Sequence, residues 1–402
     1  MQQFYAPNLL ISLALLCACV AAPVATAVPA IVPLPSATAT IAVVGKPTPT
    51  GLQSVPLQRL AKLKRGVNIA RWFMNPSGAT DEYFSGYLGE ADFIQFNAMG
   101  ITSVRLVLDP ALFLQAYAPA TVNVRMLTIL NAALDKFQAS NILVVIDMQD
   151  NNKDDWEQDP KYVSQFFTFW SAMAQQLSVR DPGGLILEVL NEPVFAGKPQ
   201  AWQNLQEKLV QVIRAAAPLH TIVVTGDDWG GVDGLLRLPV LPDKNLIYSF
   251  HFYEPYWFSH QGAGWSDKVV AGIKALPYPS SPELCVSSLK QISEPSSKKQ
   301  ATAYCDEHWN AARVEARLSQ VTDWRDKNGV PIWMGEFGII QFAPAPDRER
   351  WFTDIAAISK KFDLPMAMWG YDDGFGMARA RDVDGNLKFD PMPAKAMGWL
   401  GS

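Results

Sequence analysis

The sequence predicts a single (β/α)8 barrel, an α/β fold in which a ring of parallel strands alternates with an outer ring of helices. From residue 57 to residue 402, short apolar runs of strand length alternate with segments of helical periodicity. Two of these apolar runs end in a carboxylate, Glu192 and Glu336. Such barrels carry their functional groups at the carboxyl ends of the strands, so both glutamates fit the fold. Apolar residues make up 49% of the chain, which is enough for a large core.

The first residues indicate a targeting segment. An apolar run over residues 9–20 is too short to span a bilayer, and small residues follow it. We therefore expect a signal peptide over residues 1–22 and a secreted or periplasmic protein without a membrane span. Residues 16–19 also resemble a lipoprotein cleavage box with Cys19 as the acylated residue, so the alternative is an outer-membrane lipoprotein with a lipid anchor. Residues 23–56 are rich in Ala, Pro and Thr and predict an extended linker.

The barrel domain is expected over residues 57–402. Its predicted strands cover residues 66–70, 102–108, 142–148, the run from 185 to Asn191, 221–225, 246–252, 331–338 and 365–369. The predicted helices cover residues 91–99, 122–138, 162–177, 202–217, 303–327 and 350–361. A long insert separates the sixth strand from the helix that follows it.

Two carboxylates at the ends of two barrel strands supply what cleavage of a glycosidic bond requires. One protonates the departing oxygen, and the other attacks the anomeric carbon or activates a water molecule. The stretches Asn-Glu-Pro over residues 191–193 and Gly-Glu-Phe-Gly over residues 335–338 resemble glycoside hydrolase family 5 of clan A, whose cellulase-like members are retaining β-glycosidases. The resemblance covers residues 65–376. It implies a catalytic barrel that needs no metal and no organic cofactor.

The resemblance assigns roles to residues at the strand ends. Glu192 matches the acid/base and Glu336 the nucleophile. Arg105 matches the arginine that supports the nucleophile, and it is expected to keep Glu336 ionised. Asn191 matches the amide that binds the sugar 2-hydroxyl and orients the acid/base. Glu192 has to begin turnover protonated, so we expect a raised pKa there, whereas the deeper Glu188 is expected to be a buried structural partner.

Further positions of the same resemblance line the sugar-binding side. His251 and Tyr253 match the family's pair on the sixth strand, and because they are two residues apart on a strand, both should face the barrel mouth. Trp369 matches the platform beneath the sugar at the cleavage point. Gln149 departs from the pattern, because the family has a histidine at this position. Glutamine keeps the capacity to bond a sugar hydroxyl but cannot become charged.

Aromatic residues near the mouth carry the prediction of specificity. The chain contains 13 Trp, and flat rings stack on sugar faces. Trp72, and Trp257 and Trp265 in the insert, are expected to bind substrate. Together with Trp229 they resemble bacterial cellulases of the family. The alternative is that several of these rings only pack the insert.

Two cysteines lie in the predicted domain. Cys285 and Cys305 flank a polar loop within the insert. In an exported protein such a pair predicts a disulfide, which would restrain the insert. The alternative is two free thiols.

The sequence therefore predicts an exported enzyme that hydrolyses a β-glucan polysaccharide by double displacement. Endo-β-1,4-glucanase activity is the first expectation. The alternatives are a β-mannanase, a xyloglucanase or an exo-β-1,3-glucanase of the same family, or a sugar-binding barrel without catalysis. We expect a monomer, and the net charge of −5 argues against a nucleic-acid partner.

Overall fold

The chain divides into two units, Met1–Lys46 and Pro47–Ser402. The computed structural model describes residues 49–74, 76, 78–117, 120–149, 160–381 and 387–401, all in the second unit. The predicted signal peptide, Cys19 and the predicted linker as far as residue 48 lie outside the described residues. Within the part of the chain that is described, no helix combines the length and the apolar character needed to cross a membrane.

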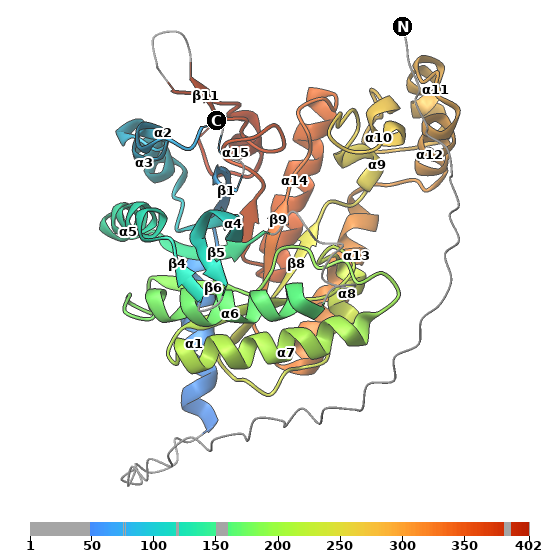
Figure 1. The fold of residues 1–402 in the computed structure, drawn as a ribbon. Helices are drawn as coiled ribbons and strands as arrows, with labels where there is room; N and C mark the ends of the chain where they lie inside the picture. Colours follow the sequence, from blue (N-terminus) through green and yellow to red (C-terminus); the bar gives the residue numbers. More distant parts are fainter. Residues whose placement is uncertain are drawn as a thin grey trace, which may run out of the picture. The chain divides into compact units, whose positions relative to one another are not determined.

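Eight parallel strands close into a barrel (Figure 1). Around the ring they are β1 (Gly66–Phe73), β10 (Met366–Met368), β9 (Ile332–Phe337), β8 (Leu246–Phe252), β7 (Thr221–Thr225), β6 (Leu185–Glu188), β5 (Leu143–Met148) and β2 (Ser103–Leu108). Neighbours in the ring follow one another along the chain, with helices between them, as a (β/α)8 barrel requires. The predicted fold class is confirmed.

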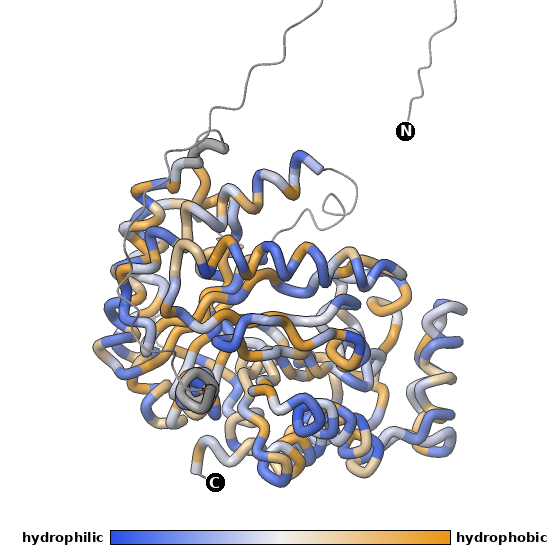
Figure 2. Tube along the Cα trace, turned by 90° about the horizontal axis from the view of Figure 1, so that it is seen from below, coloured by the Kyte–Doolittle hydropathy of each residue, from blue (hydrophilic) through white to orange (hydrophobic). Residues whose placement is uncertain are grey.

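Helices surround the barrel and connect its strands. The longer ones are α3 (Glu90–Met99), α5 (Val124–Ala139), α6 (Pro160–Leu177), α7 (Pro199–Ala216), α13 (Ala311–Asn328) and α14 (Ala345–Phe362). Local chemistry sets their ends: the Asn123 side chain accepts the Met126 N–H at the start of α5, and Gly329 ends α13 with a φ of 61°. Hydrophobic and hydrophilic residues alternate along the helices in Figure 2, because one face packs on the strands and the other meets solvent.

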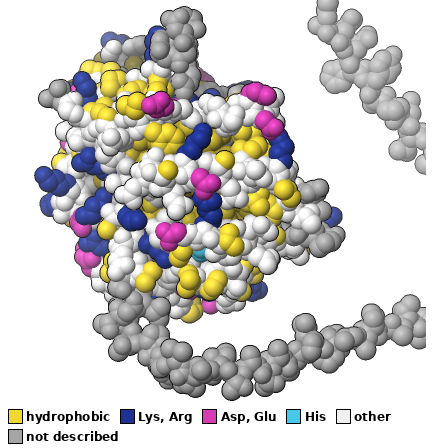
Figure 3. Space-filling model, turned by 90° about the vertical axis from the view of Figure 1, so that its left-hand side faces the viewer, with side chains coloured by type: hydrophobic (Ala, Val, Ile, Leu, Met, Phe, Trp, Pro, Cys, Tyr) yellow, Lys and Arg dark blue, Asp and Glu magenta, His cyan; other side chains and the backbone are white. Residues whose placement is uncertain are grey.

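Short elements complete the connections. They are α2 (Asp81–Gly86), α4 (Pro110–Phe113), α8 (Val232–Arg237), α15 (Met392–Ala396), the hairpin of β3 (Leu114–Tyr117) with β4 (Ala120–Val122), and the pair of β11 (Ala380–Arg381) with β12 (Leu387–Lys388). On the face shown in Figure 3, Lys and Arg side chains are interspersed with Asp and Glu among uncharged and hydrophobic groups. Over the described residues of that face, neither sign of charge forms a continuous stripe of the kind that binds nucleic acid.

Side chains that point into the barrel form a core of their own. On β5, Leu143 and Val145 point inward, whereas Val144 and Ile146 pack outward against the helices. The inner cluster also contains Leu63, Ile186, Val223, Ile247, Trp333 and Ala367. Because side chains alternate along a strand, Asp147 and Gln149 continue the inward series of β5. The strand that fills the core therefore also carries polar groups to its carboxyl end.

Helix α1 (Pro49–Leu60) and the single turn η1 (Ala61–Leu63) cover the amino-terminal end of the barrel. Leu63 joins the inner cluster, with the last residue of α1 packed against it. Arg59 donates a 3.1 Å hydrogen bond to the carbonyl oxygen of Leu219, just before β7. Helix α1 begins at Pro49, within the stretch predicted as a linker.

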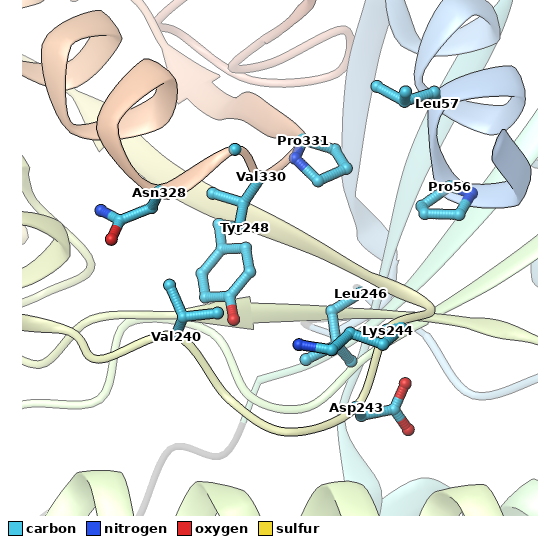
Figure 4. Close-up of a pocket in the computed structure, with 11 residues that line it drawn as sticks. Pro56, Leu57, Val240, Asp243, Lys244, Leu246, Tyr248, Asn328, Val330 and Pro331 are labelled. Atoms are coloured by element: carbon cyan, nitrogen blue, oxygen red, sulfur yellow. The ribbon is translucent and has the colours of Figure 1, made fainter. Parts of the chain in front are cut away.

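A pocket of about 110 Å³ opens beside α1 (Figure 4). Pro56 and Leu57 of α1 line it, together with Lys244 and Pro331, which lead into β8 and β9. These are the amino-terminal ends of the strands, at the opposite end of the barrel from Glu336. The pocket is therefore separate from the predicted site.

The predicted insert follows β8. It contains α9 (Tyr256–Ser259), α10 (Lys268–Gly272), α11 (Pro282–Gln291) and α12 (Pro295–Asp306), which lie beside the upper end of the barrel in Figure 1. Cys285 on α11 and Cys305 on α12 form a disulfide with a Cα–Cα distance of 6.2 Å, so the predicted bridge is present. The predicted helix over residues 303–327 is wrong as one element, because a short non-helical segment separates α12 from α13 (Ala311–Asn328). There Asn310 caps α13 by accepting the Arg313 N–H.

Candidate active site

A buried arginine on β2 joins the strands at the barrel mouth. Arg105 donates two hydrogen bonds to Glu188, of 2.7 and 3.1 Å, in the paired geometry that suits a guanidinium and a carboxylate. It also donates to Oε1 of Glu336 at 2.5 Å and lies 3.1 Å from Asp147. Burial opposes the charge of Arg105, but the three carboxylates raise its pKa well above the ordinary arginine value. The arginine therefore stays charged, and Glu188 is the buried partner that was expected.

Two amides complete the bonds of Arg105. The side-chain oxygens of Asn68 on β1 and of Asn191 after β6 each accept one N–H at 3.0 Å. Asn68 in turn donates to the carbonyl oxygen of Gly335 at 3.0 Å, beside Glu336. The guanidinium thus bonds β1 and β9 through one terminal nitrogen and β6 and the segment after it through its other nitrogens, which fixes these strand ends relative to one another.

Glu336 lies at the end of β9 with a donor on each of its oxygens. Arg105 donates to Oε1, and the hydroxyl of Tyr253 donates to Oε2 at 2.8 Å. Burial raises the pKa of Glu336, while His251 and Arg105 lower it, and the net direction is upward. Arg105 thus favours the ionised form, as expected, but burial outweighs it. The Tyr253 hydroxyl remains a donor, because burial and then Glu336 raise its pKa well above the usual range.

Glu192 approaches Glu336 from the other side of the mouth. The preceding residue, Asn191, is anchored by a 2.8 Å bond from its N–H to the Met148 carbonyl oxygen. Glu192 itself has a φ of 45°, a conformation that is rare outside glycine and is found at functional sites. Nδ1 of His251 lies 3.1 Å from Oε1 of Glu192 and 3.4 Å from Oε2 of Glu336. His251 therefore stands between the two carboxylates.

One oxygen of Glu192, one oxygen of Glu336 and a ring nitrogen of His251 all lie within 4.8 Å of one another. Among the described residues, this is the set of histidine and acidic groups close enough to share a metal ion. Both oxygens of Glu336 already accept hydrogen bonds, from Arg105 and from Tyr253. The bonds from Arg105 and Tyr253 hold Glu336 in its place within this set.

Gln149 and Trp369 lie at the ends of β5 and β10. The backbone N–H of Gln149 is held by the Leu108 carbonyl oxygen at 2.9 Å. Its side-chain Oε1 is buried and has no hydrogen-bond partner among the described residues, so it can accept a bond from a ligand. Trp369 is half-buried, and its N–H donates to the Phe337 carbonyl oxygen at 2.8 Å. Both therefore reach the mouth that holds Glu192 and Glu336.

The three tryptophans predicted to bind sugar differ in their surroundings. Trp72 is only 2% exposed, and its indole nitrogen donates to the Phe84 carbonyl oxygen while its ring stacks on Tyr87. It packs the core between the barrel and the helices, so its assignment to the substrate is corrected. Trp257 is half-buried and packs partly on the core. Trp265 is 70% exposed and remains available to a ligand.

Sequence reasoning gave Asp373 no role. It lies in the loop after β10, where its Oδ1 accepts the Phe375 N–H at 2.9 Å and its carboxylate packs against Gly370. Burial raises the pKa of Asp373 to about 7, with Asp372 and Glu336 contributing. The signal in the sequence was the pair of aspartates soon after Trp369, but nothing local shows which one packs against Gly370 beside the site.

Comparison with known proteins identifies relatives that are glycoside hydrolases. The family model for Cellulase (glycosyl hydrolase family 5) matches residues 66–374. Endoglucanase C of Acetivibrio thermocellus is 24% identical over 320 residues, which are 78% of this chain and 92% of that protein. Endoglucanase 3 of Fibrobacter succinogenes is 28% identical over 345 residues, 80% of this chain and 52% of that protein. A mannan endo-1,4-beta-mannosidase of Cellvibrio japonicus is 24% identical over 203 residues, 48% of this chain and 42% of that protein.

Solved structures share the fold. Cel5A of Thermotoga maritima in complex with cellobiose superposes with a TM-score of 0.67 at 22% identity, covering 85% of this chain and 99% of that one. The cellulose synthase subunit Z of Clostridioides difficile superposes with a TM-score of 0.66 at 21% identity, covering 83% and 99%. At these identities the likeness concerns the arrangement of strands and helices.

Proposed function

Because the chain belongs to glycosyl hydrolase family 5, the cellulase family, we propose that it cleaves β-1,4-glucan within the polymer, with retention at the anomeric carbon. The observation that carries the proposal is the approach of an oxygen of Glu192 to within 4.8 Å of an oxygen of Glu336. Retaining enzymes hold their two carboxyl groups about 5–5.5 Å apart, whereas inverting enzymes need about 6.5–9.5 Å to admit a water molecule. The separation therefore supports direct attack by one carboxylate.

In the first step, Glu336 attacks the anomeric carbon and Glu192 gives a proton to the departing oxygen. The bond from that carbon to the leaving oxygen breaks as an ester bond to Glu336 forms. Arg105 and Tyr253 hold the two oxygens of Glu336 in a fixed direction, so little reorganisation is needed for the attack. His251 contacts both carboxylates and would keep their separation constant.

In the second step, a water molecule takes the place of the leaving group. Glu192, now ionised, removes a proton from the water as the water oxygen attacks the anomeric carbon. The ester bond to Glu336 breaks, and the sugar leaves with its original configuration. Asn191 and Gln149 line the same mouth, and we assign them to the sugar hydroxyls, with Trp369 beneath the ring at the cleavage point.

The choice of β-1,4-glucan rests on the relatives and on the insert. Endoglucanase C and Endoglucanase 3 are named for cleavage within a glucan. Exposed Trp265 and Tyr256 on the insert suit stacking along an extended sugar chain. The mannosidase among the relatives favours β-mannan as the second candidate substrate.

A substrate panel tests the proposal. The purified chain and its Glu336→Ala variant would be assayed on a soluble cellulose derivative, mixed-linkage β-glucan, β-mannan and laminarin. We expect the cellulose derivative to be cleaved, with viscosity falling faster than reducing ends accumulate, because cleavage within the polymer shortens it most per bond broken. Preference for mannan would move the assignment to the second candidate. Binding without cleavage by the unchanged chain would leave a sugar-binding barrel.

We also propose that the enzyme is exported and acts as a monomer. The predicted signal peptide over residues 1–22 and the Cys285–Cys305 bridge support export, because disulfides persist in oxidising compartments. Fractionation of producing cells, with mass measurement of the mature amino terminus, would separate a cleaved, soluble form from one acylated at Cys19. Light scattering of the purified chain would give its oligomeric state.

A further inference from the structure

Two consecutive residues of the insert, Ser259 and His260, connect it to the strand ends that carry the nucleophile and its partner. Ser259 is fully buried, and its Oγ donates a 2.6 Å hydrogen bond to the carbonyl oxygen of Tyr253. The carbonyl oxygen of Ser259 accepts the N–H of Ile340 at 2.9 Å, in the segment that follows Glu336. The insert is therefore bonded to the backbone at the ends of β8 and β9.

The ring of His260 packs against the ring of Tyr253. Their centroids are 5.1 Å apart and their planes are inclined by 69°, which is an edge-on contact. Phe375, in the loop after β10, meets the ring of Tyr253 at 5.8 Å and the ring of His260 at 4.8 Å, again edge-on. Aromatic pairs prefer this arrangement, so the three rings hold one another in orientation. They come from the end of β8, from the insert and from the loop after β10.

His260 is itself held in place. Its Nδ1 lies 2.8 Å from Oγ of Ser259, and its ring stacks on the ring of Tyr256 with centroids 4.4 Å apart. Its backbone N–H donates to the carbonyl oxygen of Tyr256 at 3.0 Å. Burial lowers the pKa of His260 to about 4, against the smaller opposing influence of Glu192. The imidazole is therefore neutral above that pH, and it acts on its neighbours as a rigid ring rather than as a charge.

The orientation of the Tyr253 ring matters because its hydroxyl donates to Oε2 of Glu336 at 2.8 Å. A hydrogen bond weakens steeply when its angle departs from linearity, so a small rotation of the ring would weaken it. Tyr253 follows the last residue of β8, and the sheet ladder does not extend to it. The packing of His260 and Phe375 on the ring therefore sets the direction of the hydroxyl.

We propose that His260 is a positioning residue for the nucleophile: it holds the ring of Tyr253 at the angle at which the hydroxyl meets Glu336. The insert then contributes to the chemical step as well as to the surface beside the mouth. This inference rests on the proposed function, because it concerns Glu336 as the attacking group. Since His260 acts through Tyr253, its contribution should disappear when the Tyr253 hydroxyl is absent.

A double-mutant cycle with Tyr253→Phe tests this dependence. The substrate is 2,4-dinitrophenyl β-cellobioside, whose activated leaving group barely needs a proton, so kcat/KM reports the attack by Glu336. His260→Ala should lower kcat/KM about tenfold. It should also move the acid limb of the pH profile of kcat/KM to higher pH, because the bond that favours the ionised form of Glu336 is weakened. In the Tyr253→Phe background, the same replacement should cost less than about twofold.

Two further variants separate positioning from a general loss of structure. His260→Phe keeps a flat ring against Tyr253 and Phe375, so it should recover most of the rate and return the acid limb toward its original place. His308 is an exposed histidine between α12 and α13 with a φ of 54°. Asparagine tolerates that backbone conformation, so His308→Asn should change neither the rate nor the limb.

The outcomes are distinct. Equal losses from His260→Ala with and without the Tyr253 hydroxyl would overturn the inference, because His260 would then act by another route. An acid limb that stays in place, or a His260→Phe variant as slow as His260→Ala, would also overturn it. If the unchanged enzyme cleaves neither the aryl cellobioside nor soluble β-1,4-glucan, the proposed function itself fails, and this inference with it.

Discussion

The hydroxyl of Tyr253 donates a 2.8 Å hydrogen bond to Oε2 of Glu336, the oxygen that Arg105 leaves uncontacted. Burial raises the pKa of Glu336, and the bond from Tyr253 is one of the influences that lower it. Tyr253→Phe removes this bond without changing the ring. The pKa of Glu336 should then rise further, so the acid limb of the pH profile of kcat/KM should move to higher pH.

The same variant should lose about 10- to 100-fold in kcat/KM at the optimum, because a hydrogen bond to a charged group is worth about 1.5–3 kcal/mol. Full pH profiles of the variant and the unchanged enzyme on one soluble substrate check both effects. His260 packs edge-on against the Tyr253 ring at 5.1 Å, and that contact is retained in the variant. An acid limb that stays in place would show that Tyr253 does not tune the nucleophile.

Replacement of Glu336 by alanine should abolish turnover on every substrate, because no other group can form the ester. Added azide should restore part of the activity on an activated aryl glycoside by attacking the anomeric carbon itself. The sugar azide formed should have inverted configuration by NMR, since only one displacement takes place. A rescued product of retained configuration would contradict the role of Glu336.

Replacement of Glu192 by alanine should act on a different step. Natural glucan has a poor leaving group and should be cleaved about 10²–10⁴-fold more slowly, the usual contribution of a general acid. An activated aryl glycoside barely needs the proton, so its first step should survive while its second slows. Stopped-flow measurement should then show an early burst of aryl product. Near-normal cleavage of glucan by this variant would remove Glu192 from the mechanism.

Asp373 should make stability depend on pH. Burial raises its pKa from 3.8 to about 7, so the folded state holds a proton that the unfolded chain has already released over this range. Stability from this group is therefore present at low pH and is lost as pH rises to about 7. Asp373→Asn removes the effect, because asparagine does not titrate. Its side-chain oxygen can still accept the Phe375 N–H. Urea denaturation should show the variant gaining on the unchanged enzyme between pH 4 and 8, by up to about 4 kcal/mol. A pH-independent difference would contradict the buried, protonated carboxyl.

The Cys285–Cys305 bridge should stabilise the insert. It closes a loop of 20 residues, for which the loss of unfolded-state entropy amounts to about 3 kcal/mol. The double variant with serine at both positions should therefore melt at a lower temperature, and the unreduced native enzyme should show neither of these two thiols on titration. Equal melting temperatures for the reduced and oxidised enzymes would show that the bridge adds no stability.

Much of the site could be predicted because strand geometry is regular. His251 and Tyr253 are two residues apart and both contact Glu336, as the alternation of a strand requires. For Trp72, the same assumption of regular alternation along a strand gives the wrong prediction. Asn68 faces the barrel interior, and strict alternation would also direct Trp72 toward the mouth. The register of β1 against β2 shifts between Ile69 and Phe73, so the alternation is lost and the ring enters the outer core.

Other differences have their cause in tertiary contacts that composition does not reveal. The segment before residue 57 has the Pro and low charge of a linker, yet α1 is helical from Pro49. Its stability comes from packing against the base of the barrel rather than from helix propensity. Likewise, no local signal showed that Asp373 would accept the Phe375 N–H, whereas Asp372, the more buried of the two, accepts the N–H groups of Ala70 and Arg71 on β1. Burial of each aspartate is decided by distant strands.

The packed base of the barrel limits the route by which water and products enter and leave the site. Leu63 and the inner side chains of β5 to β10 pack together below Glu192 and Glu336, and α1 covers them from outside. Among the described residues, this leaves the water that ends each cycle no passage along the barrel axis. It has to arrive through the same opening by which the first product departs. A product that leaves slowly would therefore block the entry of water, so the covalent intermediate would be hydrolysed only after that product has left.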